Sequence, residues 1–80
     1  MTGKSLEHFI ALPEATQDEG GLAFAEVHLH ARDEKSPVIV RRVLLDQTYR
    51  SLDEAHAAAT RFIDDQLAEA GENGELILKS

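Results

Sequence analysis

Apolar positions recur along residues 52–70 with the period of an amphipathic α-helix. At about 100° per residue these positions gather on one side, while charged side chains occupy the other. We therefore predict a helix over this segment that covers a sheet with its apolar side. The positions on this side are Leu52, Ala55, Ala59, Phe62, Ile63, Gln66 and Ala70, with Leu67 at its border.

Both ends of the predicted helix carry recognisable signals. Ser51 and Glu54 have the spacing of a capping box, in which each side chain accepts a hydrogen bond from the backbone amide of the other. Gly71 follows the last turn and can adopt the left-handed conformation that ends many helices. These signals predict that the helix begins at Leu52 and ends at Ala70.

Residues 22–32 alternate in the manner of a half-buried strand. One face carries alanine, valine and leucine, and we expect it to lie under the helix. The opposite face carries Glu26, His28, His30 and Arg32. The sequence therefore predicts a central strand with one polar face.

Residues 38–45 are apolar on both faces, so either register turns one arginine toward the helix and leaves apolar side chains outside. A bulge, or arginine stems lying over the apolar patch, would account for this pattern within one chain. Burial of the second sheet face against another copy or another protein would account for it equally well. The interface residues predicted by this second explanation are Phe24, Val38, Val40 and Leu44.

The N-terminal segment has a weaker pattern. Residues 5–12 alternate as a strand does, and a short helix is the competing interpretation. Pro13 is expected to end this segment, and a polar, acidic loop follows it. The predicted strand places Leu6, His8, Ile10 and Leu12 on one face.

The C-terminal residues 75–79 follow an Asn-Gly turn signal and form either a short fourth strand along a sheet edge or a disordered tail. Together the patterns predict an α+β fold in which a three-stranded antiparallel sheet is covered on one face by a single C-terminal amphipathic helix. The sequence also allows a short fourth strand of this sheet at the C-terminus. Eighty residues are expected to form one domain, residues 1–80.

The composition narrows the class of protein. The absence of cysteine excludes a disulfide framework and a thiolate zinc site, and it suits a cytoplasmic protein. The apolar run at residues 9–12 is too short for the core of a signal peptide, and we expect no membrane segment. A net charge of −7 disfavours a nucleic-acid partner and favours a basic one.

Few residues suggest chemistry. His28 and His30 leave the same face of one strand, where a metal ion could bridge them with Glu26 as a third ligand. The competing interpretation is that the two imidazoles pair across the sheet with Arg41 or Arg42. The chain has no cysteine nucleophile, no glycine-rich phosphate loop and no serine elbow, so we expect neither catalysis nor a cofactor.

The junction before the helix carries a resemblance to known folds. Residues 49–55 read Tyr-Arg-Ser-Leu-Asp-Glu-Ala, and Ala59 and Phe62 follow one and two turns later. This string resembles the strand-to-helix junction of small bacterial β-β-β-α domains, a layout shared with HicB-like antitoxins and double-stranded-RNA-binding-like folds. A double-stranded-RNA-binding domain carries lysines at the helix start to grip phosphates, whereas this chain has Asp53 and Glu54 there.

These observations favour a non-catalytic protein-interaction module that self-associates as a homodimer or binds a protein partner. A metal or small-ligand binding module that uses His28, His30 and Glu26 is the first alternative. An antitoxin-like or nucleic-acid-associated regulator is the second.

Overall fold

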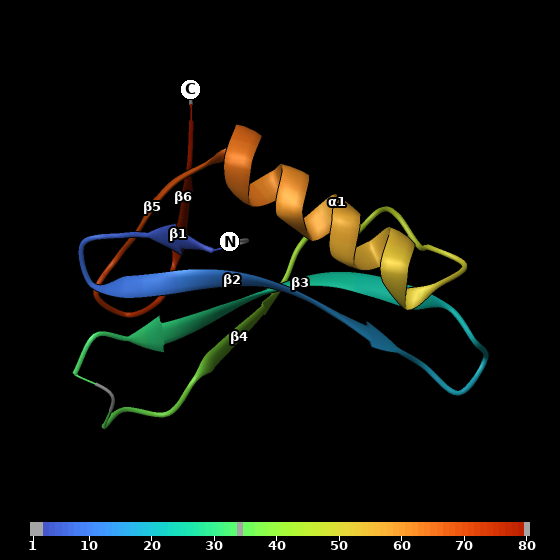
Figure 1. Cartoon of the computed structure of the whole chain (residues 1–80), viewed down its shortest axis with the longest axis horizontal. Helices are drawn as coiled ribbons and strands as arrows, with labels where there is room; N and C mark the ends of the chain where they lie inside the picture. The colour runs from blue at the N-terminus through green and yellow to red at the C-terminus, as the bar shows by residue number, and fades with distance from the viewer. Residues whose placement is uncertain (1–2, 34, 80) are drawn as a thin grey trace.

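Four antiparallel strands form the main sheet in the order β1-β2-β3-β4 (Figure 1). The computed structural model describes residues 3–33 and 35–79. Strands β2 and β3 pair along nine residues each, whereas β1 has two residues and β4 has four. The strands are β1 Lys4–Ser5, β2 Phe9–Gln17, β3 Ala23–Ala31 and β4 Ile39–Arg42.

One helix and a second, two-stranded sheet lie together on one side of the main sheet, as Figure 1 shows. The helix is α1 Leu52–Asp65, and the second sheet pairs β5 Leu67–Ala70 with β6 Leu76–Leu78. Within the described residues, no helix or strand lies on the opposite side of the main sheet. The main sheet therefore has a covered face and an open face.

The core lies between α1 and the covered face of β2 and β3. The predicted alternation in β3 is confirmed, since Ala25, Val27 and Leu29 are buried on this face. Ala55 and Ala59 of α1 are also buried, and their small side chains let the helix approach the strands closely. The core cluster comprises Leu6, Phe9, Ala11, Ala25, Val27, Leu29, Val43, Ala58, Ala59, Phe62, Ile63, Leu67 and Ala70.

The start of α1 agrees with the sequence. Ser51 has an extended backbone, and its hydroxyl accepts a hydrogen bond from the amide of Glu54 at 3.1 Å. This bond satisfies one of the amide donors that the first helical turn leaves unpaired. Asp53 and Glu54 add negative charge at the positive end of the helix dipole.

The predicted end of the helix is wrong, because α1 ends at Asp65 rather than Ala70. The last turn carries two aspartates and no basic residue, which is unfavourable at the negative end of the helix dipole. Lys79, which lies after β6, donates hydrogen bonds to the carbonyl groups at this end of the helix. Its amide donates to Gln66 O at 2.7 Å, and its ammonium group donates to Asp64 O at 3.0 Å.

Residues 67–70 form β5 instead of a fifth helical turn. Leu67 and Ala70 are both buried and paired with β6, and a bulge between Leu67 and Glu69 interrupts the strict alternation that would place them on opposite faces. Gly71 opens the hairpin turn, and its carbonyl accepts from the amide of Gly74 at 2.8 Å. Gly74 has a φ of 86°, a left-handed conformation that glycine adopts without a steric penalty.

The N-terminal prediction is also wrong in its details. Residues 4–17 form two antiparallel strands joined by a tight turn, in which the amide of Leu6 donates to Phe9 O. Strand β2 continues through Pro13 to Gln17. Proline is tolerated there because β1 pairs with β2 only as far as Ala11, so Pro13 has no partner strand on that side.

The fold class is α+β as predicted, but its layout needs three corrections. The helix lies in the middle of the chain and is followed by two strands. The fourth strand of the main sheet is the N-terminal β1. The C-terminal β6 pairs with β5 in a separate sheet, because the hairpin turn at residues 71–74 returns the chain onto β5 rather than onto the main sheet.

Candidate functional site

The open face of the main sheet is the candidate site. Its side chains form cross-strand rows, because paired residues in an antiparallel sheet point to the same face. The rows are Thr16 with Phe24, Glu14 with Glu26 and Arg42, Leu12 with His28 and Val40, and Ile10 with His30. Val38, immediately before β4, lies at the end of the last row.

Apolar side chains occupy one half of the open face. Ile10 is 39% exposed, Val38 is 44% exposed and Val40 is 51% exposed, and Leu12 beside them is half-buried. A hollow of about 450 Å³ lies between β2 and the loop before β4. Its lining comprises Ile10, Leu12, His30, Ala31, Arg32, Ser36 and Val38.

A buried carboxylate occupies the other half of the open face. Glu26 is only 5% exposed although no secondary-structure element of the described residues covers this face. Thr16 Oγ1 donates to Glu26 Oε2 at 3.0 Å, and His28 Nε2 lies 3.0 Å from Glu26 Oε1. Arg42 completes the cluster with its terminal nitrogen 3.8 Å from Glu26 Oε2.

Arg42 also covers an aromatic ring. Its guanidinium carbon lies 4.3 Å from the centre of the Phe24 ring, within the range of a cation–π contact. The planar guanidinium therefore shields Phe24 from solvent and places positive charge beside Glu26. This arrangement leaves the Glu26 carboxylate buried beside one positively charged group.

The pairing of β4 with β3 determines which arginine of residues 38–45 points toward the helix. Ile39 and Arg41 pair with Leu29 and Val27 and point toward the covered face. Arg41 reaches the β5–β6 turn, where its Nε donates to Gly74 O at 2.9 Å. As expected, one arginine lies on the helix side of the sheet.

The predicted metal ligands are brought together only in part. Glu26 contacts His28, but His30 pairs with Ile10 in another row. In residues 3–33 and 35–79, no three histidine or carboxylate side chains lie close enough to hold a metal ion. Of the three predicted metal ligands, only Glu26 and His28 are in contact in this structure.

The predicted interface residues separate into two groups. Phe24, Val38 and Val40 lie on or beside the open face. Leu44 lies beyond the end of β4, has a left-handed backbone with a φ of 54°, and packs against the core cluster. Leu44 is therefore separated from the open face.

The sequence interpretation missed two contributors to this face, Thr16 and Glu14. Their signal was present, because Ile10, Leu12, Glu14 and Thr16 alternate without interruption on one face of β2. The sequence-based prediction ends this strand before Pro13. An edge position for Pro13 would have extended the strand to include both residues.

A second hollow, of about 500 Å³, lies at the edge of the sheet beside the loop between β3 and β4. Asp33 holds this loop, since Asp33 Oδ1 accepts from the amides of Lys35 and Ser36 at 2.9 and 3.2 Å. These hydrogen bonds lower the pKa of the Asp33 carboxyl. The Asp33 carboxylate therefore stabilises the turn between β3 and β4.

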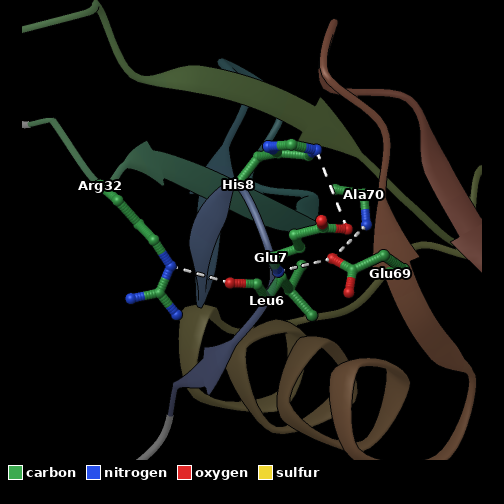
Figure 2. Close-up of polar contacts among 6 residues, drawn as sticks. All are labelled: Leu6, Glu7, His8, Arg32, Glu69 and Ala70. Atoms are coloured by element: carbon green, nitrogen blue, oxygen red, sulfur yellow. Dashed lines mark hydrogen bonds and ion pairs between the residues drawn. The ribbon is translucent and has the colours of Figure 1, made fainter.

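A polar cluster joins the β1–β2 turn to β5, as Figure 2 shows. The amide of Glu7 donates to Glu69 Oε1 at 3.0 Å, and the amide of Ala70 donates to the same oxygen. Arg32 Nε donates to Leu6 O at 2.9 Å from the other side of the turn. The Glu69 contact joins the second sheet to the first, and the Arg32 contact holds the β1–β2 turn, so the cluster has a structural role.

The Glu69 contact predicts a dependence of stability on pH. Hydrogen bonds from the amides of Ala70 and Glu7 hold the pKa of the Glu69 carboxyl below its ordinary value of 4.5. Since folding lowers this pKa, the contact stabilises the fold at higher pH and is lost as the pH falls through the lowered pKa.

We expect Glu69→Gln to be less stable than the parent near neutral pH, and the difference to shrink below about pH 4.5. The protonated parent side chain then resembles glutamine. Urea unfolding of both proteins across this pH range measures the difference. A constant difference at every pH would contradict the assignment.

Comparison of the chain with models of protein families, with curated proteins and with solved structures finds no match. Within the described residues, no helix has both the length and the hydrophobicity needed to cross a bilayer.

Proposed function

We propose that this protein is a non-catalytic interaction module that associates with a second copy of itself through the open face. The observation that carries the proposal is the exposure of Ile10, Val38 and Val40 together on this face. The other face of the same sheet is sealed by α1 and the β5–β6 hairpin (Figure 1). Contiguous exposed apolar side chains rimmed by polar groups are typical of protein interaction surfaces.

The size of the open face supports this function. A standard interface takes about 800 Å² from each partner. That area is roughly 15% of the 5206 Å² accessible surface of the chain. One whole side of a two-layer domain is large enough to supply it.

The charge distribution favours a second copy at this face. The chain carries a net charge of −7, so two copies repel each other over most of their surface. Among the described acidic residues, only Glu14 and Glu26 belong to the open face, and Arg42 offsets one of them. Electrostatic repulsion between two copies is therefore weakest there.

Val40→Lys is expected to convert the dimer into a monomer, because the new ammonium group would have to be buried without a partner. Light scattering of the native protein across a range of concentrations measures the mass. Ile77→Lys is the matched control, since Ile77 is 48% exposed on β6, outside the open face. A parent protein that stays monomeric at every concentration would overturn the proposal.

A further inference from the structure

We propose that the two copies stack face to face about a two-fold axis that runs along β3, so that β2 of each copy covers β4 of the other. This inference rests on the proposed function and specifies its geometry. A rotation about β3 exchanges β2 with β4 and keeps each cross-strand row opposite the same row of the partner. The register of the sheet therefore determines which side chains meet.

The apolar residues match under this rotation. Leu12 and Val40 share a row on opposite sides of His28. In the dimer Leu12 faces the partner's Val40, and Ile10 faces the partner's Val38. Because the exposed apolar side chains of β2 and β4 lie in the same rows, each finds an apolar partner and loses its contact with water.

The charged residues match in the next row. Glu14 and Arg42 lie on opposite sides of Glu26, so the rotation places Glu14 against the partner's Arg42. Arg42 can pair with a second carboxylate, because its side chain is 48% exposed and its ion pair with Glu26 is 3.8 Å long. The dimer then contains two equivalent Glu-Arg pairs between the copies.

The central strand tolerates the same rotation. Each Glu26 faces the partner's Glu26, but each carboxylate already has Thr16 and His28 as close polar neighbours and Arg42 as its ion-pair partner. These groups stabilise the negative charge within each copy. At one end of the strand, the Phe24 rings of the two copies lie opposite each other, each covered by its own Arg42 guanidinium.

A two-fold axis across the strands gives a poorer match. That rotation places β2 over β2 and reverses the order of the rows. About an axis through the row of His28, Glu14 would then lie against the partner's Ile10, and Arg42 against the partner's Val38. Burying charged groups against apolar side chains is costly, so the pattern of the face favours the axis along β3.

Cysteine crosslinking distinguishes the two axes, because the parent chain has no cysteine. Packed sheets lie about 10 Å apart, which is too far for a disulfide, so a short bismaleimide is the appropriate crosslinker. The single variants are Leu12→Cys, Val40→Cys and His28→Cys. Light scattering first establishes that each variant is a dimer.

We expect Leu12→Cys and Val40→Cys to crosslink with each other after being unfolded and refolded as an equal mixture. Each alone is expected to give no crosslink, since identical residues lie about 10 Å apart sideways as well as 10 Å apart in height. His28→Cys lies on the axis and is expected to crosslink with itself, which serves as the positive control for stacked faces. Mass spectrometry identifies each product.

The outcomes separate this inference from the proposed function. A dimer in which Leu12→Cys and Val40→Cys each crosslink with themselves overturns the axis along β3 but retains the open face as the interface. A dimer in which none of the three variants crosslinks overturns the face-to-face geometry. A monomeric parent overturns both proposals.

Discussion

Phe62→Ala is expected to lower the free energy of unfolding by about 3 to 5 kcal/mol. Phe62 is 6% exposed and belongs to the core cluster between α1 and the sheet. Its removal loses the transfer free energy of the ring and leaves a cavity, which the flanking Ala58 and Ala59 are too small to fill. A chain of 80 residues has a total stability of about 4 to 12 kcal/mol, so the variant would lose a large part of it.

Urea unfolding followed by circular dichroism measures this effect. Leu52→Ala is the control within the same helix, because Leu52 is 45% exposed and alanine favours helix formation. We expect that control to stay within about 0.5 kcal/mol of the parent. Equal stability of the Phe62→Ala variant and the parent would contradict the position of the core.

Leu67→Ala is expected to cost about 2 to 5 kcal/mol. Leu67 is fully buried in β5 and is among the largest side chains with no exposed surface. It packs in the same cluster as Phe62 and Ile63, so the loss of its side chain leaves a cavity at the end of the core. Its position in β5 also joins the second sheet to α1.

Leu78→Ala provides a control of identical chemistry. Leu78 is the cross-strand partner of Leu67 in β6, yet it is 49% exposed. We expect this variant to change the unfolding free energy by less than about 0.5 kcal/mol. Similar losses for the two leucines would contradict the difference in burial between Leu67 and Leu78.

The helix shows where local pattern stops being informative. Leu67 follows Ile63 by four residues, so it continues a helical stripe, yet it lies in β5, where a bulge between Leu67 and Glu69 allows both Leu67 and Ala70 to be buried. Both arrangements bury the same residues. The decision depends on β6 and on Lys79, which caps the end of α1 from outside the helix.

The open face shows a similar limit. The outward residues of β3 were predictable from alternation, and three of the four predicted interface residues do lie on or beside this face. The grouping of Thr16, His28 and Arg42 around Glu26 was not predictable, because it depends on the register of three strands. Two of these partners lie 10 and 16 residues from Glu26 along the chain.

Local chemistry alone specifies the start of α1 and the inward face of β3. A capping serine acts within one helical turn, and alternation acts within one strand, so neither needs distant contacts. Tertiary contacts decide where α1 ends, that Pro13 lies within a strand, and which arginine of β4 points inward. Each of these outcomes depends on the free energy of pairing between distant segments. A single segment of sequence does not determine that free energy.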